Sequence, residues 1–600
     1  MGMSEEEDLV LSVSLRAALL SRLRGPAPAA PASRDVPAEP QQNETPAQPR
    51  RLRRIAGRAL TAGAVVLIFA ALIMPNVVGR LARPGTYVRL PIEGFLAVGI
   101  VLLLRGRWKR IAAAAFGAGL GVLTVEKALD MGFNKVLARP FDLVLDWELF
   151  DDAYAFVQDS SGRAAAVGAL AGIVLLVLAV LVLMTRAALR VAKAAERHRT
   201  ASARTSLAGI AVWVVLLVLG VQIFEKTPVA ARASVTYAWD RVVAVQAGLQ
   251  DEENFAREVK VDAFAATPPD QLLTGLRGKD LLVTFVESYG RSALEDPALA
   301  PGTVKVLEEG AADLAKAGYV AKSGWLTSPT AGGGSWLAHA TLLSGLWINN
   351  QQRYRNLTAS ERLTLTSLSK RAGFDTISVM PGAKRAWPEG SFYGYNRVYD
   401  SRNTGYAGPR FSWSPQPDQY TLSWFQKNVH GPAHAPMFVE MPLVSSHTPW
   451  APIPSFIDWD DVGDGAIYEQ IKKDAKRSGS VWQDAAKVKR EYGRSIQYTL
   501  TTIISYLEKF GDENTVMVFL GDHQPSSVVV GDGASRDVPI TIVTKDKAVL
   551  DRVAGWNWTD GIKPAPGAPV WRMDQFRDKF LTAYGPATGV ASRALSAPRR

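Results

Sequence analysis

Five side chains in the second half of this 600-residue chain are of the types that metal-assisted attack on an anionic ester requires. They are Glu287, Ser335, His447, Asp522 and His523. Asp522 and His523 are adjacent, so a carboxylate oxygen and an imidazole nitrogen can reach one divalent ion. Glu287 could supply a further oxygen, and Ser335 could bind the same ion as its alkoxide. Such an ion would lower the pKa of the serine and shield the charge of an incoming phosphate.

Ser335 follows three glycines, Gly332–Gly334, and opens a stretch with a helical pattern of apolar residues. Glycine tolerates positive φ without a Cβ clash, so the backbone can turn sharply and approach a ligand closely. The start of a helix also favours an anion, because its N–H groups are free and its dipole is positive there. Ser335 therefore fits a nucleophile, although an N-cap serine is the simpler interpretation of this stretch alone.

The other residues also have structural interpretations when each is taken alone. Glu287 could be a surface carboxylate, Asp522 a turn or cap residue, and His447 a loop histidine with a structural hydrogen bond. However, the apolar, β-rich run 281–286 ends at Glu287, and the run 515–520 ends one glycine before Asp522. Ligands of open α/β sheets bind at the carboxyl ends of the strands. We therefore expect these side chains to collect in one site.

The elements around these residues alternate between strand and helix patterns. Such alternation predicts an α/β domain with a largely parallel sheet covered by helices on both faces. The further strand candidates are 375–380 and 436–441, and the helical candidates are 303–317, 359–372 and 485–510.

The first part of the chain is apolar instead. Each of five spans approaches the roughly 20 residues that cross a bilayer. Glu126 and Lys127 limit the third span. The spans are about 60–79, 90–105, 111–128, 164–185 and 207–224.

Charged residues between the spans predict their orientation. Basic residues crowd the end of the N-terminal tail and the segments 105–110 and 186–206, which places all three on the cytoplasmic side. The segment 129–163 fits the outer side, because it is acid-rich. Its acidic residues include Asp142, Asp146, Glu148, Asp151 and Asp152. Five spans from a cytoplasmic N-terminus place everything after about residue 225 outside the membrane.

These patterns predict five regions. They are a disordered cytoplasmic tail (1–58), a five-helix transmembrane domain (59–225), a helical juxtamembrane connector (226–277), a catalytic α/β domain (278–585) and a flexible C-terminal tail (586–600).

Composition excludes several classes of chemistry. The chain has no cysteine, which excludes disulfides, cysteine-ligated zinc and thiol catalysis. The net charge of +11 could suggest nucleic acid, but the basic residues lie beside the apolar runs and no nucleic-acid-binding motif is present. We therefore expect a lipid bilayer as a partner, and no nucleic acid.

From about 278 to 585, the chain resembles the alkaline-phosphatase/sulfatase superfamily. Within it, the chain is most similar to the membrane-anchored lipoteichoic acid synthase and phosphoglycerol transferase family, in which five transmembrane helices precede an extracytoplasmic sulfatase-like domain. The stretches 380–387 and 394–400 are also similar to that family. The resemblance implies that Ser335 replaces the usual threonine nucleophile and that His447 contacts substrate. It implies a metal site of Glu287, Ser335, Asp522 and His523.

The substrate pocket departs from the family pattern. Lipoteichoic acid synthases flank a tryptophan, which Trp387 resembles, with a histidine and an arginine that hold glycerol phosphate. Here those places fall near Met380 and Glu389, although Arg385 or Lys384 could substitute for the arginine.

His339 is a further departure, because relatives often have an acid there. It lies four residues after Ser335, on the same helix face, so it could support the substrate site or be a buried structural histidine. Sulfatases that form formylglycine need Pro and Arg where this chain has Leu337 and His339. Phosphoethanolamine transferases usually carry disulfides, which this chain cannot form.

The resemblance implies transfer of a phosphoglycerol-type group from a membrane phospholipid to a cell-envelope glycan or polymer, through a covalent intermediate on Ser335, in a bacterial-type cell membrane. Manganese is the implied metal, with magnesium and zinc as alternatives. With water as the acceptor, the protein would instead be an extracytoplasmic phosphodiesterase, phosphatase or sulfatase without formylglycine. A catalytically silent envelope scaffold is a third hypothesis.

Overall fold

The computed structural model describes residues 48–586, except residues 138, 148, 225, 226, 412, 476, 477 and 532. Most of the predicted N-terminal tail (1–58) and C-terminal tail (586–600) therefore lies outside the described residues, as does Glu148.

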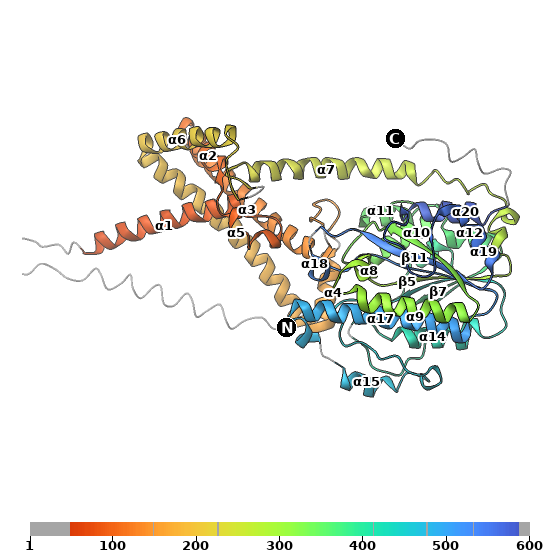
Figure 1. Ribbon diagram of the computed structural model, residues 1–600. Helices are drawn as coiled ribbons and strands as arrows, with labels where there is room; N and C mark the ends of the chain where they lie inside the picture. Colours follow the sequence, from red (N-terminus) through yellow and green to blue (C-terminus); the bar gives the residue numbers. More distant parts are fainter. Residues whose placement is uncertain are drawn as a thin grey trace, which may run out of the picture. The chain divides into compact units, whose positions relative to one another are not determined.

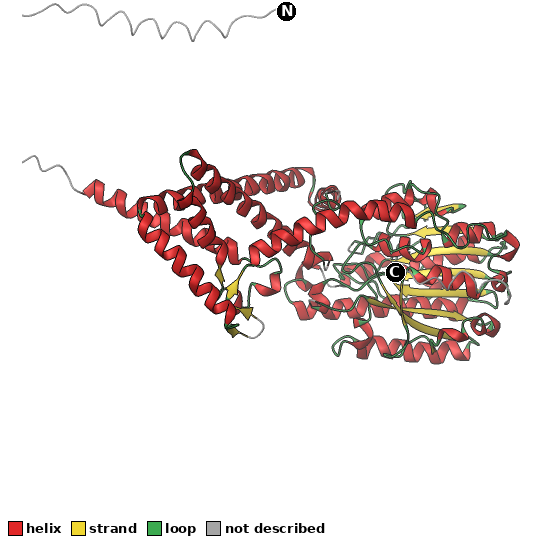
Figure 2. Cartoon of the chain, turned by 90° about the horizontal axis from the view of Figure 1, so that it is seen from above, coloured by secondary structure: helices red, strands yellow, loops and turns green. Residues whose placement is uncertain are grey.

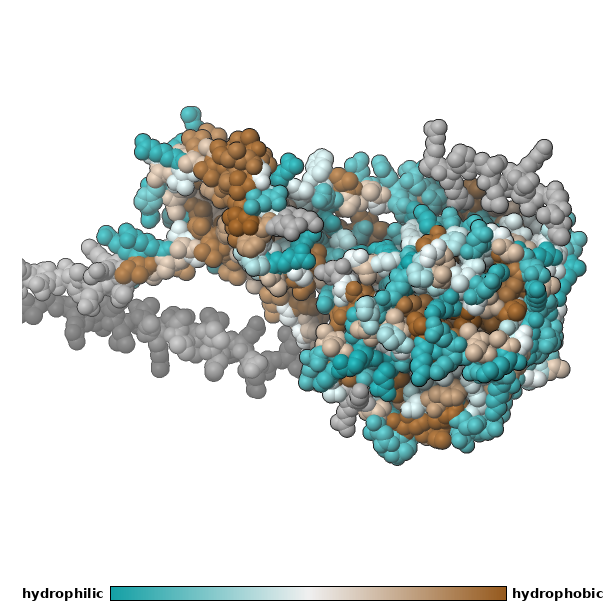
Figure 3. Space-filling model, in the orientation of Figure 1, coloured by the Kyte–Doolittle hydropathy of each residue, from teal (hydrophilic) through white to brown (hydrophobic). Residues whose placement is uncertain are grey.

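Among the described residues, four helices are long and apolar enough to cross a membrane. An apolar, brown surface covers this part of the chain at the upper left of Figure 3. A further apolar helix, α2, has only 12 residues, so the predicted number of five spans is not confirmed. The helices are α1 (Gln48–Ile73), α2 (Ile92–Leu103), α3 (Arg107–Leu137), α5 (Arg163–Arg197) and α6 (Arg199–Val218).

Two boundaries of these helices differ from the sequence prediction. The predicted loop 186–206 is helical almost throughout, since α5 runs to Arg197 and α6 begins at Arg199. Alanine, arginine and lysine are strong helix formers, so the helix continues beyond its apolar part. Likewise, α3 continues through Glu126 and Lys127, which lie inside the fold rather than at its end. The Lys127 ammonium, for example, donates to Ala71 O and to Ser234 Oγ at 3.2 Å.

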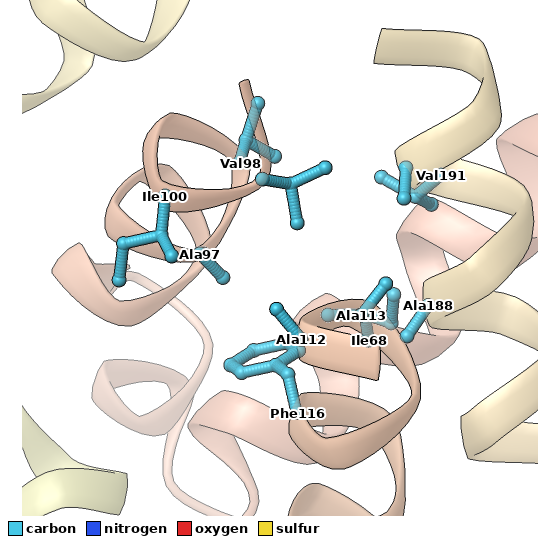
Figure 4. Close-up of a pocket in the computed structure, with 12 residues that line it drawn as sticks. Ile68, Ala97, Val98, Ile100, Ala112, Ala113, Phe116, Ala188 and Val191 are labelled. Atoms are coloured by element: carbon cyan, nitrogen blue, oxygen red, sulfur yellow. The ribbon is translucent and has the colours of Figure 1, made fainter. Parts of the chain in front are cut away.

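A small apolar cavity of about 130 Å³ lies among these helices. Figure 4 shows its lining, which includes Ala97, Val98, Ala113, Phe116 and Val191. None of the titratable candidates from the sequence lines it, so we assign it no part in the chemistry.

The predicted connector contains one long helix, α7 (Ala233–Glu258). Towards its end and beyond it, the chain contributes to the core of the α/β domain. Phe255, Leu272, Leu273 and Leu276 are all buried in that core. The chain before residue 278 therefore helps to fold the domain as well as to link it.

The α/β domain is built on a sheet of nine described strands, in the order β12-β6-β11-β10-β5-β9-β7-β8, with β13 also paired to β6. Figure 2 shows these strands side by side in yellow. The pairs from β10 to β8 are parallel, whereas β11 is antiparallel to both of its neighbours. The strands are β5 (Asp280–Val286), β6 (Val320–Thr327), β7 (Asp375–Met380), β8 (Arg397–Asp400), β9 (Met437–Leu443), β10 (Thr515–Gly521), β11 (Asp537–Thr544), β12 (Thr559–Asp560) and β13 (Val570–Arg572).

Helices cover both faces of this sheet (Figure 1). One core gathers side chains from α10, α11, α12 and α20, and the other gathers them from α9, α14 and α17. Strands such as β5 and β10 are buried on both faces, which explains their continuous apolar sequences. The main helices are α9 (Ala300–Lys316), α10 (Ser335–Ser344), α11 (Gln351–Thr358), α12 (Leu365–Arg371), α14 (Asp418–Phe425), α17 (Ala485–Phe510) and α20 (Gln575–Ala583).

The predicted α/β class with a mostly parallel sheet is confirmed. The strands expected at 281–286, 375–380, 436–441 and 515–520 and the helices expected at 303–317 and 485–510 are all present. The candidate 359–372 is helical only from Leu365. The antiparallel strand β11 and its neighbour β6 were not predicted.

Candidate active site

Three adjacent parallel strands assemble the site. In their register, Val286 at the end of β5 pairs with Gly521 of β10 on one side and with Leu443 of β9 on the other. The residues that follow these strands therefore leave the sheet at the same edge. Glu287, Asp522 and the loop that carries His447 meet there for this reason.

A glycine allows the ends of β5 and β10 to approach closely. A Cβ on Gly521 would lie 1.8 Å from Tyr289 O, so a side chain at this position would clash with the backbone. The approach lets Asp522 Oδ1 accept hydrogen bonds from Ser288 N and from His523 N, both at 2.7 Å. One oxygen of Asp522 is thus committed to the backbone, which fixes the direction of the other.

Ser335 is the first residue of α10 and enters the site from the helix N-terminus. Gly334, with φ at 80°, occupies the N-cap position, so Ser335 is not the capping residue. Its Oγ instead donates to Glu287 Oε2 at 2.8 Å and lies 3.2 Å from His523 Nε2. The predicted glycine turn is present, since Gly332, Gly333 and Gly334 all have positive φ.

Glu287, Asp522 and His523 form a candidate metal centre. Their ligand atoms all lie within 4.8 Å of one another. His523 Nε2 lies 3.4 Å from Glu287 Oε1 and 3.6 Å from Asp522 Oδ2. His523 Nδ1 lies 2.8 Å from Gln524 O, a hydrogen bond that orients Nε2 towards the carboxylates.

The charge distribution of this group fits a divalent cation. Asp522 is 0% exposed, and its Oδ2 has no hydrogen-bond partner among the described residues. Burial, and then the neighbouring charge of Glu287, raise the pKa of Asp522 well above its usual range. Burial opposes ionisation of Glu287 too, but His523 and His447 lower its pKa overall. A cation would compensate both carboxylates and give Asp522 Oδ2 a partner.

His447 lies at the edge of this group. Its ring stacks on Trp413, with centroids 4.0 Å apart, and its Nδ1 forms a hydrogen bond with Thr448 O. Burial lowers the pKa of His447, and the charge of Glu287 partly opposes that effect. Lys384 Nζ lies 5.2 Å from the same Trp413 ring. Trp413 was not predicted from the sequence, because nothing in its loop marks it as a neighbour of His447.

His339 has a different partner. Its ring stacks on Phe285 at 3.9 Å, and its Nδ1 lies 3.3 Å from Glu440 Oε1. Glu440 is 1% exposed, and its Oε2 accepts a hydrogen bond from Tyr395 OH. The sequence marks Glu440 only as a charged residue inside an apolar strand, and we did not predict its role.

The remaining two predicted residues do not join the metal-ligand group directly. Trp387 packs in an aromatic cluster with Tyr393 and Tyr395, at centroid distances of 5.2 and 6.2 Å. Arg385 is exposed. One chain of contacts leads from Trp387 through Tyr395 and Glu440 to His339.

Comparison with known proteins indicates the family that this domain is similar to. A protein-family model described as sulfatase matches residues 284–542, so this part of the chain is similar to the sulfatase family. The predicted resemblance to membrane-anchored, sulfatase-like proteins is thereby confirmed. None of the curated proteins matches the sequence.

Several solved structures are similar to this chain at low identity. The lipoteichoic acid synthase LtaP from Listeria monocytogenes is 12% identical, with a TM-score of 0.35, over 56% of this chain and 79% of that chain. The phosphoglycerol transferase GacH from Streptococcus pyogenes, in complex with sn-glycerol-1-phosphate, is 14% identical, with a TM-score of 0.32, over 56% and 90%. The lipooligosaccharide phosphoethanolamine transferase A from Neisseria meningitidis is 12% identical, with a TM-score of 0.39, over 88% and 95%.

Proposed function

Because residues 284–542 are similar to the sulfatase family and follow apolar helices, we propose that this protein is a membrane phosphotransferase. It moves a phosphoglycerol-type group from a membrane phospholipid to a cell-envelope glycan or polymer. One observation carries the proposal. The Ser335 hydroxyl donates at 2.8 Å to Glu287, inside a buried group of three metal-type ligands.

The proposed metal ligands are Glu287, Ser335, Asp522 and His523. Manganese is the proposed ion, with magnesium and zinc as alternatives. When bound, a divalent ion supplies positive charge that favours the ionised serine and offsets the charge of the phosphate. The fit rests on the two buried carboxylates and on the unpartnered Oδ2 of Asp522.

Ser335 is the proposed nucleophile. Its Oγ forms a bond to the phosphorus of the phospholipid while the bond between phosphorus and the diacylglycerol oxygen breaks. The serine proton leaves along its hydrogen bond to Glu287 Oε2. The diacylglycerol oxygen takes a proton from the protonated imidazole of His447. The acceptor hydroxyl later attacks the phosphoserine and returns a proton to His447, while the bond between phosphorus and Ser335 Oγ breaks and Ser335 regains its proton from Glu287.

His447 is suited to this task by its fixed orientation. Its Nδ1 is engaged by Thr448 O and its ring by Trp413, so Nε2 is the atom left for substrate. Lys384 adds positive charge beside the same tryptophan, which favours an anionic headgroup. We assign Trp387 and Arg385 to the outer part of the headgroup pocket. We assign His339, on the same helix as Ser335, to the positioning of that serine.

Attachment to a bilayer suits a lipid donor. A tethered domain meets phospholipid headgroups at a high effective concentration. In the proposed topology, α2 completes a set of five spans, the N-terminus is cytoplasmic and the sulfatase-like domain is extracytoplasmic. The basic segments between the apolar helices support this orientation.

The decisive experiment is to identify what Ser335 carries. The full-length protein is incubated with phospholipids that are isotope-labelled in the headgroup, quenched with acid, digested and analysed by mass spectrometry. We expect the peptide that contains Ser335 to gain the mass of a glycerophosphoryl group, which is glycerol phosphate less one water, and diacylglycerol to be released in equal amount.

The Ser335→Ala protein is the control, and it should show neither product. A different added mass would replace the proposed headgroup. If the label appears in free glycerol phosphate even when glycan is present, water is the acceptor and the protein is a hydrolase. Release of diacylglycerol at an unchanged rate by Ser335→Ala would disprove the serine nucleophile.

A further inference from the structure

A second group of metal-type side chains lies at the opposite end of β5 from the candidate active site. Asp280 is the first residue of β5, whereas Glu287 follows the last. His430 ends the π-helical turn after α14, and His434 lies before β9. The ligand atoms of Asp280, His430 and His434 all lie within 4.8 Å of one another. A strand of this length separates them from Glu287 by roughly 20 Å, so the two groups are distinct.

The orientation of His430 favours a ligand. Its Nδ1 lies 3.0 Å from Gln426 Oε1 and 3.0 Å from Tyr506 OH, which hold the ring in place. Its Nε2 has no hydrogen-bond partner among the described residues, although the side chain is only 6% exposed. A buried polar atom without a partner is costly. One ring nitrogen held by a polar neighbour and the other left open is the arrangement of metal-binding histidines.

The unpartnered nitrogen points at a buried carboxylate. His430 Nε2 lies 3.8 Å from Asp280 Oδ2, which is too long for a hydrogen bond. Asp280 Oδ1 accepts from Met437 N at 3.1 Å, so the backbone fixes this carboxylate. Atoms bound to one zinc ion at about 2 Å lie roughly 3.3 Å apart in a tetrahedron, so a small contraction would complete the geometry.

His434 closes the group on the solvent side. Its Nδ1 lies 3.7 Å from Asp280 Oδ1 and 3.0 Å from Ala435 O, and its ring stacks with that of His430 at a centroid distance of 5.6 Å. The side chain is 22% exposed, so an ion can enter past it and the ring can turn. The charge of Asp512 also acts on Asp280 and on His430, and adds to the attraction for a cation.

We propose that Asp280, His430 and His434 bind a zinc ion, with water as the fourth ligand. Two imidazoles and one carboxylate are ligands that zinc prefers, and three protein ligands with one open position are a common zinc arrangement. The ion would join the start of β5, the turn after α14 and the segment before β9. The site is independent of the proposed transferase chemistry and stabilises the domain from the other end of its central strands.

Metal counting tests the proposal. The full-length protein in detergent is stripped with chelator, loaded with zinc alone, desalted and measured for zinc per chain by mass spectrometry. We expect His434→Ala to bind one ion fewer per chain than the wild type and to lose part of the zinc-dependent rise in melting temperature. His434 is partly exposed, so this variant should fold.

Two further variants make the result specific. Asn428→Ala, on the exposed side of the same turn, should keep the wild-type zinc count. Asp522→Asn with His523→Ala should also lose one ion, and that loss should add to the loss in His434→Ala. Equal zinc counts and equal melting shifts in the wild type and His434→Ala would overturn the proposal.

Discussion

His523 Nε2 lies 3.2 Å from Ser335 Oγ, although 188 residues separate the two in sequence. The contact depends on two structural features. The parallel pairing of β5 and β10 carries His523 to the edge of the sheet, and a left-handed glycine turn starts α10 with its first residue pointing at that edge. Each feature can be recognised in the sequence, but only the fold brings His523 and Ser335 together.

Replacement of Ser335 by alanine should remove turnover almost completely. The variant keeps the helix start but has no oxygen to attack phosphorus, so we expect the rate to fall by at least about 10³-fold. Ser335→Thr keeps a hydroxyl and should retain activity within about tenfold of the wild type. Diacylglycerol release from labelled phospholipid measures both, and Ser423→Ala on α14 serves as a matched control with wild-type turnover.

Removal of the metal should have an effect similar to that of Asp522→Asn. Asparagine preserves the volume of Asp522 but not the charge on its unpartnered Oδ2. We expect this variant to lose the metal from the active site. Changes to residues that merely support metal ligands lower activity by up to about 100-fold, so the rate of Asp522→Asn should fall by more than that. Chelation of the wild type should lower the rate similarly, and added manganese should restore it. Full activity in excess chelator would contradict the metal site.

His447 and Trp413 should contribute unequally. His447→Gln removes a proton donor next to the reacting group, so we expect kcat to fall by about 10²-fold. Trp413→Leu keeps that donor but removes the stacked ring, which is worth about 1 kcal/mol, so the loss should be about fivefold. Steady-state kinetics with both variants distinguish the roles. Equal losses would mean that the imidazole acts only through its packing.

His339 and Glu440 should be energetically coupled. His339→Ala would leave Glu440 buried without its imidazole partner, and we expect a loss of about 3 kcal/mol in the free energy of unfolding. Adding Glu440→Gln to the His339→Ala variant should recover part of that lost stability, because it removes the buried charge. Denaturant unfolding of the single and double variants measures the coupling, and additivity within about 0.5 kcal/mol would show that the pair is independent.

Asp262 should make the domain sensitive to acid. It accepts two hydrogen bonds from Arg577, which is 0% exposed. Burial opposes ionisation of Asp262, but the charge of Arg577 and its hydrogen bonds lower the pKa below the usual 3.8 overall. A lowered folded pKa stabilises the fold above pH 3.8, and that stability is lost as the pH falls through the folded value.

The pH dependence of unfolding tests this pair. In the wild type, the free energy of unfolding should fall below about pH 4, whereas Asp262→Asn should be less stable at neutral pH and show a flatter acid limb. The conservative Asp270→Asn variant is the control, since Asp270 is exposed on the same segment. An acid limb of unchanged slope in Asp262→Asn would rule out this contribution.

The sequence alone was sufficient to predict the central strands and to single out the polar residues that follow them. A strand buried on both faces must be a continuous apolar run, and the polar residue that ends it must lie at the sheet edge. Glu287, Ser335, His447 and the Asp522-His523 pair could therefore be proposed as a set from the residues, and the resemblance supplied the roles expected of Ser335 and His447. The apolar spans could also be recognised as continuous apolar runs. Their ends could not be predicted, because helix propensity extends α5 and α6 into charged residues.

Tertiary structure alone decided which strands are neighbours and what the buried polar groups face. Nothing local shows that β5 lies between β10 and β9 or that β11 runs antiparallel, since pairing depends on contacts across the whole domain. The helical spacing left open whether His339 supports the substrate site or is a buried structural histidine, and only the folded chain shows its ring against Phe285 and Glu440. The cluster of Asp280, His430 and His434 joins residues about 150 positions apart, so only the folded chain brings them within 4.8 Å.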